Sequence, residues 1–506
     1  MKTTYFYLIF LVASFVGSTS ISGQPVEAPS HLEEINIDLG IHNGKNIDLL
    51  DANGVRIEPN VYTIAGTIAF PPDAYIVVQE SIGAADHAPW IRLVFGEVEL
   101  GENSYIIITS DFDQDQQYFN ARTIEEWYYH SAFFKGESVT LQLYVAPGDE
   151  GVTIEIPQLI VGDFVGGQPI PLDVCGSDNR LTSTYQHIDG RLMPLGCTGW
   201  ISAAGFYLTA GHCLDVSSAS LQIMEFYVPA SLCDGTTQPA AVNNQYPVIY
   251  SSRVFQNVTI GDDWGIFNVG ANSNTGRTPA ENQRAYYHLS KDLSPPSIFI
   301  RGFGTDNVPT GCTGGNNADS QTCQYHTSSS QGEFGSGSTV YWEYQTDTDG
   351  GNSGSAVLAS GVSGVDFHSV GIHTNGYCVP PNEGNEGTSF EADDTESNMS
   401  TYWQTQVEYV DIDHHLSSTN GTSVQPHYSL QVALNQANAG HGPGVSALEL
   451  IPIAGSNYGS GGVYPQVVSY SGATNAVVIR RTVGAVKIGP NALADSPIIA
   501  TLENGD

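Results

Sequence analysis

The chain has 506 residues, of which 41% are hydrophobic and 14% charged, and its 16 basic and 53 acidic residues give a formal net charge of −37. This length provides for about two to four domains with packed cores. So negative a protein repels phosphates, which argues against nucleic-acid binding and favours solubility in a salty exterior.

Residues 1–23 predict a secretory signal peptide. One lysine precedes an apolar stretch from Tyr5 to Val16, and small residues follow it. The stretch is too short to span a bilayer, and no later run in the sequence is long enough. We therefore expect a secreted, extracellular protein without a transmembrane segment, cleaved between Ser18 and Gly23.

Residues 24–168 predict a β-sandwich or jelly roll. The segment "SVTLQLYVAP" places Val139, Leu141, Leu143 and Val145 on one face. Other β-branched runs, such as "YIIITS" and "VTIEIPQLIV", are separated by turn signals such as "PPDA" and "PGDEG". The role of this domain stays open between a removable pro-segment, a retained module that binds glycans or surfaces, and a structural spacer.

An acidic motif lies inside this predicted sandwich. "DFDQDQQ" places Asp111, Asp113 and Asp115 at alternate positions. It lacks the glycine and the distal glutamate of an EF-hand loop. We interpret it as a solvated acidic turn rather than a calcium site.

Residues 170–438 are rich in Gly, Ser and Thr, and they hold all seven cysteines. In a secreted chain these predict disulfides, with at least one cysteine left over, whereas the absence of CxxC argues against zinc. We interpret the acidic stretch at about 382–425 as an exposed insertion, and residues 440–506 as a β-rich tail or small module. Three sequons are candidate glycosylation sites: Asn257, Asn398 and Asn420.

Three segments of this region carry candidate catalytic side chains. "DTDGGNSGS" places Ser353 between glycines, "LTAGHC" supplies His212 after an apolar strand, and "GDDWGIF" supplies Asp263 before one. A serine nucleophile needs a base, and the base needs an orienting acid. Each residue alone is more often structural, but the set of three indicates catalysis.

The order His212, Asp263, Ser353, together with "CTGWIS" before "YLTAGHC", resembles the three signature segments of the chymotrypsin-like serine peptidases. The resemblance covers about residues 172–438 and neither the sandwich nor the tail. It implies an all-β fold with two barrels and the triad between them, polypeptide substrates, and no metal or organic cofactor. We expect a monomer.

The resemblance also implies a role for each residue. Ser353 would be the nucleophile and His212 the general base, which Asp263 would orient. Backbone N–H groups of Gly351 and Ser353 would form the oxyanion hole. Because the family places the acid directly before an aromatic residue, Asp262 is expected to face solvent.

The family's disulfide beside the catalytic histidine is matched by Cys197 and Cys213. Cys312 and Cys323 bracket the loop "TGGNNADSQT" and form a second predicted bridge. At most one further bridge can form among three cysteines, and its pairing stays open: Cys175, Cys233 and Cys378.

The segments "DTDGGNSGS" and "GIHTNG" most resemble the glutamyl-endopeptidase-like branch of these peptidases. By this resemblance, His373 and Thr348 would line the specificity pocket, and Thr374, Asn375 and Gly376 would pair with the substrate backbone as an added strand. A histidine and a hydroxyl suit an acidic side chain. We therefore expect cleavage after acidic residues, or a broad preference.

Asp347 supports a different preference. In trypsin-like enzymes an aspartate six residues before the serine binds Lys or Arg, so basic specificity is the alternative. Asn352 stands where digestive trypsin-like enzymes have the Asp that binds a new N-terminal ammonium. A neutral amide cannot form that ion pair, so the usual zymogen switch is not expected.

Two rival functions remain. One is a catalytically silent homologue that serves as an adhesion or binding protein, against which the complete set of catalytic residues argues. The other is an esterase of the α/β-hydrolase type. That class needs GxSxG and the order Ser, Asp, His, whereas here Ser355 occupies the fifth position and the order differs.

Overall fold

The computed structural model describes residues 27–44, 73–165, 174–176, 178, 180–183, 187–202, 206–283, 285–290, 295–305, 331–361, 368–376, 378 and 384–392, and the backbone of strands at 324–328, 405–410, 447–452, 476–479 and 501–502. The predicted signal peptide, Cys312, Cys323, Asn398 and Asn420 lie outside these residues. Within them, no helix has the length and apolar character needed to span a membrane.

The first part of the chain is a sandwich of two antiparallel sheets. One sheet contains β1 (Ser30–Asp38), β9 (Thr153–Gly162), β3 (Trp90–Val94) and β7 (Phe134–Lys135), with β4 (Val98–Glu99) paired to β9. The other contains β2 (Tyr75–Gly83), β8 (Ser138–Val145), β5 (Tyr105–Ser110) and β6 (Gln116–Asn120), which leads into α1 (Ala121–Glu126). The predicted alternation is confirmed in β8, where the four apolar residues are fully buried and the residues between them are partly exposed.

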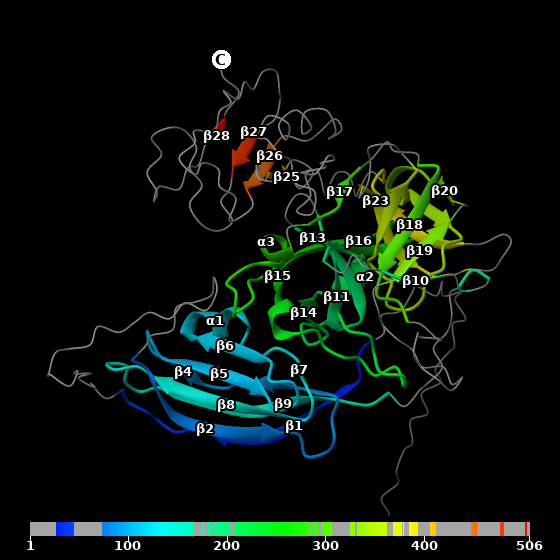
Figure 1. Ribbon diagram of the computed structural model, residues 1–506. Coiled ribbons are helices and arrows are strands. Elements are labelled where there is room, and N and C mark those ends of the chain that lie inside the picture. The colour runs from blue at the N-terminus through cyan, green and yellow to red at the C-terminus, as the bar shows by residue number, and fades with distance from the viewer. Residues whose placement is uncertain are drawn as a thin grey trace, which may run out of the picture.

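A closed six-stranded barrel follows, which we call the first barrel. Its strands run in the order β11 (Asp189–Pro194), β12 (Cys197–Ile201), β13 (Tyr207–Thr209), β16 (Asp262–Val269), β15 (Gln245–Thr259) and β14 (Leu221–Glu225). Three short helices lie between or after these strands: α2 (Gly211–Leu214), η1 (Val242–Asn244) and α3 (Pro279–Gln283). Figure 1 shows this barrel between the sandwich and the next sheet.

The next sheet has nine strands and does not close within the described part of the chain. Its order is β10 (Leu181–Thr182), β19 (Gln324–Ser328), β18 (Ser297–Gly302), β22 (Ala356–Ser360), β23 (His368–Asn375), β24 (Asn385–Ser389), β21 (Tyr341–Tyr344) and β20 (Gln331–Phe334), with β17 (His288–Leu289) paired to β23. The 3-10 helix η2 (Gly337–Thr339) connects β20 to β21. We call this half-barrel the second barrel.

The fold is therefore all-β, as predicted, and a closed barrel followed by a half-barrel fits the chymotrypsin-type architecture. A further small sheet contains β25 (Thr405–Val410), β26 (Ala447–Pro452), β27 (Ala476–Ile479) and β28 (Thr501–Leu502).

One part of the predicted acidic insertion is wrong. Strand β24 lies inside the stretch 382–425, yet it pairs with β21 and β23, and most of its residues are buried. Its composition is polar, but Gly387 lets β23 approach, since a Cβ there would lie 2.6 Å from the carbonyl oxygen of Ile372. Pairing on both sides, rather than apolar side chains, makes this segment part of the fold.

Two disulfides lie in the described residues. The predicted bridge joins Cys197 to Cys213, and a second bridge joins Cys175 to Cys378, which settles the open pairing. Cys233 is also disulfide-bonded. The two remaining cysteines, Cys312 and Cys323, lie outside the described residues. A bridge from Cys233 to either of them excludes the predicted bridge between the two.

Candidate active site

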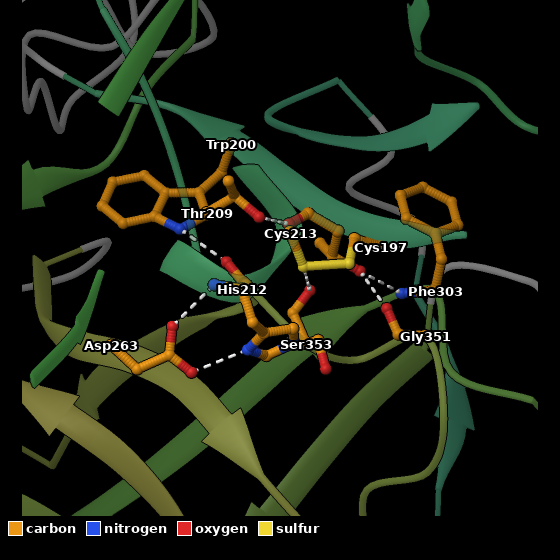
Figure 2. Close-up of a disulfide and its surroundings, with 11 residues drawn as sticks. Cys197, Trp200, Thr209, His212, Cys213, Asp263, Phe303, Gly351 and Ser353 are labelled. Carbon is orange, nitrogen blue, oxygen red and sulfur yellow. Dashed lines mark hydrogen bonds and ion pairs between the residues drawn. A yellow bond between two sulfur atoms is a disulfide. The ribbon is translucent and has the colours of Figure 1, made fainter. Parts of the chain in front are cut away.

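The candidate catalytic residues come from both barrels. His212 lies in α2 and Asp263 at the start of β16, both in the first barrel, whereas Ser353 lies in the loop between β21 and β22 of the second. Figure 2 shows the imidazole of His212 between the carboxylate of Asp263 and Ser353. The structure thus brings together three residues that are 51 and 90 positions apart in the sequence.

Asp263 holds His212 by both of its carboxylate oxygens. Oδ2 lies 2.6 Å from Nδ1 of the imidazole, and Oδ1 accepts a hydrogen bond from the backbone N–H of His212 at 2.9 Å. Asp263 is only 5% exposed, so little water competes for these contacts. An Nδ1–H directed at a carboxylate leaves Nε2 as the basic nitrogen, and this buried Nε2 has no hydrogen-bond partner within the described part of the chain.

Asp263 is itself fixed from the second barrel. The side-chain oxygen of Thr388, on β24, accepts from the backbone N–H of Asp263 at 3.2 Å and donates to its carbonyl at 2.7 Å. Sequence reasoning missed Thr388 because it lies in the acidic stretch interpreted as an insertion. Its hydroxyl ties the acid of one barrel to a strand of the other.

The backbone around Ser353 is held tightly. Its carbonyl accepts from the N–H of Thr198 at 2.9 Å, and Gly354 donates its N–H to the carbonyl of His373 at 2.8 Å. Gly354 has a φ of +90°, and a Cβ there would lie 2.1 Å from Oγ1 of Thr209. Only glycine fits this position, which presents the preceding serine in a sharp turn.

The predicted oxyanion-hole peptide has a fixed orientation. The carbonyl of Gly350 accepts from the N–H of Thr305 at 2.9 Å. In a trans peptide the C=O and the following N–H point in opposite directions, so the N–H of Gly351 points away from Thr305. Among the residues that the structure describes, this N–H has no acceptor. It is a donor available to an anionic oxygen.

Asn352 holds the loop before Ser353 by neutral contacts. Its side chain is fully buried, and its Oδ1 accepts from the N–H of Asp349 at 3.0 Å. It packs on Gly304, where a Cβ would lie 2.0 Å from the same oxygen. The loop before Ser353 is therefore held by an amide that needs no ammonium partner.

Asp347, on which the alternative of basic specificity depends, accepts a hydrogen bond from the backbone of another segment. Asp347 is fully buried, and its Oδ1 accepts from the backbone N–H of Cys175 at 2.8 Å. The adjacent carbonyl of Thr346 accepts from Nδ2 of Asn385 at 2.8 Å. The carboxylate thus binds the segment that precedes the first barrel.

His373 is buried and neutral. Its Nδ1 lies 2.7 Å from the hydroxyl of Tyr344, a contact that the sequence did not indicate. Burial, and the nearby His212, lower the pKa of His373 to about 3. Its side chain is only 2% exposed, so it carries no charge at neutral pH.

The other predicted pocket residues are also buried. Thr348 is fully buried, and its Oγ1 has no hydrogen-bond partner among the residues that are described. The same holds for Thr374, near the end of β23, and Asn375 and Gly376 are buried next to it. These unpartnered hydroxyls provide polar groups around His373.

Two further predictions concern single residues. Asp262 does not face solvent as expected, since it is 8% exposed at the start of β16. Asn257 of the first sequon is exposed, and its Nδ2 donates to Asp215 at 3.1 Å. The first prediction failed because burial at this strand end includes both aspartates.

One group of potential metal ligands lies near the site. The sulfurs of Cys197 and Cys213 lie close to His212. These sulfurs are joined in the disulfide, so they are not thiolate ligands.

No protein-family model and no curated protein matches the chain. Among the solved structures that do match is a crystal structure of the thermostable serine protease AL20 from an extremophilic microorganism, with 13% identity and a TM-score of 0.28, over 41% of this chain and 92% of that one.

Proposed function

We propose that the protein is a secreted serine endopeptidase in which Ser353, His212 and Asp263 hydrolyse peptide bonds. The observation that carries the proposal is the pair of contacts from Asp263 to His212, which fixes the ring and leaves a basic Nε2 beside Ser353. That arrangement is what a serine nucleophile needs for activation.

The mechanism follows from these groups. The hydroxyl oxygen of Ser353 attacks the scissile carbonyl while Nε2 of His212 takes its proton and then gives it to the leaving amine as the peptide C–N bond breaks. A water molecule, deprotonated by the same Nε2, then hydrolyses the ester on Ser353, and the proton returns to the serine oxygen. Asp263 stabilises the imidazolium that forms in between. The N–H groups of Gly351 and Ser353 bind the developing oxyanion, and each such donor contributes about 3–4 kcal/mol in enzymes of this kind.

For the residue before the cut, we propose an acidic or broad preference. The contact of Asp347 with the Cys175 amide favours a structural role for this carboxylate over the binding of Lys or Arg. His373 and the unpartnered hydroxyl of Thr348 supply polar groups suited to a carboxylate. A neutral histidine offers a hydrogen bond rather than a full charge, which also agrees with a broad preference.

The test is a labelling experiment followed by cut-site mapping. A fluorophosphonate should label the protein but not Ser353→Ala, and cuts in a denatured protein mixture should require Ser353. Acidic residues before the cuts would support the pocket of His373 and Thr348, whereas Lys or Arg would support Asp347. A folded protein that neither labels nor cuts would instead be the silent binding homologue.

A further inference from the structure

We propose that residues 27–165, the sandwich, stay bound to the first barrel as a permanent non-covalent part of the protein, even where the chain between them is cut. Cleavage before the barrels would then not release the sandwich as a free pro-segment. The proposal concerns an interface and does not depend on the proposed catalytic function.

The sandwich and the first barrel share a hydrophobic core. The core of the sandwich includes three residues of the first barrel, each at most 1% exposed: Met193, Ile223 and Val242. Met193 on β11 pairs with Ile223 on β14, while their neighbours Leu192 and Met224 pair inside the barrel core. Alternate residues of these strands therefore serve opposite cores, and without the sandwich one set would face water.

A buried polar contact lies at the same interface. Gln245 is fully buried at the start of β15. Its Oε1 accepts from the N–H of Phe133 and its Nε2 donates to the carbonyl of Phe133, both at 2.8 Å. The side chain of Gln245 thus bonds both backbone groups of Phe133, as a neighbouring strand would. Separating the sandwich from the barrel breaks both hydrogen bonds.

The edge of the second sandwich sheet is also bound by the barrel half of the protein. β6 is the last strand of that sheet, and its open edge meets Asn274 of the first barrel. Oδ1 of Asn274 accepts from the N–H of Tyr118, and its Nδ2 donates to the carbonyl of Gln116, both at 2.7 Å. Exposed strand edges promote aggregation, so a sandwich without the barrel would lose this protection.

A buried cation also belongs to the interface. Arg92 of β3 is 2% exposed and lies over the ring of Phe133, with its carbon 4.8 Å from the ring centroid. Its guanidinium donates to Gln222 of the barrel and, at 2.6 Å, to the carbonyl of Ser131. Water is excluded from these contacts, as in the interior of a domain rather than at a loose contact between domains.

The sandwich binds only the first barrel in the described part of the chain. Its hydrogen bonds to the rest of the protein end on residues 194–274, and none reaches the loop of Ser353. Figure 1 shows the sandwich on the side of the first barrel away from the second. It supports the half that carries His212 and Asp263 and leaves the candidate site uncovered.

The test uses the full chain with a recognition site for a specific protease built in between residues 165 and 174. No cysteine precedes Cys175, so no disulfide can join the two pieces after the cut. We expect them to co-elute in gel filtration at micromolar concentration and to unfold in one transition. Separation into two folded species would overturn the proposal.

Variants at and away from the interface test which surface of the first barrel binds the sandwich. In the cut protein, Met193→Glu should release the sandwich, whereas Val258→Glu should not, because Val258 is 70% exposed on the same barrel. If Met193→Glu fails to fold, Asn274→Ala provides a milder change. Loss of its two hydrogen bonds should weaken association by about ten- to a hundredfold. Association unchanged in Asn274→Ala and in folded Met193→Glu would also overturn the proposal.

Discussion

The hydroxyl of Thr198 joins the first barrel to the loop that precedes Ser353. Its oxygen donates to the carbonyl of Gly351 at 2.8 Å and accepts from the N–H of Phe303 at 2.9 Å. Thr198 is fully buried, so both bonds are shielded from water. A single side chain in the first barrel therefore sets the position of a predicted oxyanion-hole residue in the second.

Replacing Thr198 with valine removes this hydroxyl at nearly constant shape. The variant loses both hydrogen bonds, to Gly351 and to Phe303. The bond to Gly351 bears directly on the predicted oxyanion hole, and its loss alone costs about 1 kcal/mol, so we expect kcat to fall by about fivefold or more while KM changes little. Thr198→Ser, which keeps the hydroxyl, should restore the rate. The measurement is steady-state kinetics of both variants with one peptide substrate. A Val variant with the parent kcat would show that Thr198 does not position Gly351.

The two neighbouring aspartates provide a matched pair of variants. Asp263→Asn should lower kcat by about 10³- to 10⁴-fold, because an amide at this position favours the wrong histidine tautomer. Asp262→Asn changes the adjacent residue in the same way and should keep kcat within about tenfold of the parent, since no contact to the imidazole would be lost. Circular dichroism checks the fold of both. A larger loss of kcat in Asp262→Asn would assign the role of the orienting acid to Asp262.

The sequence predicted the parts of this site that depend on local signals. The motifs around Ser353, His212 and Asp263 contain the glycines and apolar strands that the chemistry needs, and the alternation in β8 predicted its buried face. Thr198, Thr388 and Tyr344 were missed. Each hydroxyl forms a hydrogen bond with a segment far away in the sequence. The residues around a single Thr or Tyr do not indicate which segment that is.

The prediction of an exposed insertion at about 382–425 was wrong for a related reason. Low apolar content predicted an exposed insertion, yet β24 is buried between two strands. Backbone hydrogen bonds to both neighbours stabilise it, and these do not depend on side-chain hydrophobicity. The same limit applies to Asp262, which is only 8% exposed at the start of β16 although its local sequence is polar.

The preference for glutamate over glutamine before the cut should rise as the pH falls from 8 to 6. The pKa of His373 is lowered to about 3 in the free protein, so the ring is neutral throughout this range. The negative charge of a bound glutamate raises the pKa of the His373 ring and favours its protonated form. Binding of glutamate, but not of glutamine, then takes up a proton, and this becomes easier at lower pH. The ratio of kcat/KM for matched Glu and Gln peptides measures this. A ratio independent of pH would show that His373 does not contact the substrate side chain.

A buried acid between the barrels should make stability depend on pH. Asp189 accepts from the hydroxyl of Tyr287 at 2.7 Å and lies 3.9 Å from Arg301, and burial raises its pKa from 3.8 to about 7 despite both neighbours. Between these values the folded protein binds more protons at this group than the unfolded chain does. Its contribution to the free energy of unfolding should therefore decrease as the pH rises from 4 to 7, by at most about 1.4 kcal/mol per pH unit. Urea unfolding of the parent and of Asp189→Asn across this range isolates that contribution, since the variant cannot take up the proton. Parallel pH profiles for the two proteins would mean that Asp189 stays ionised beside Arg301.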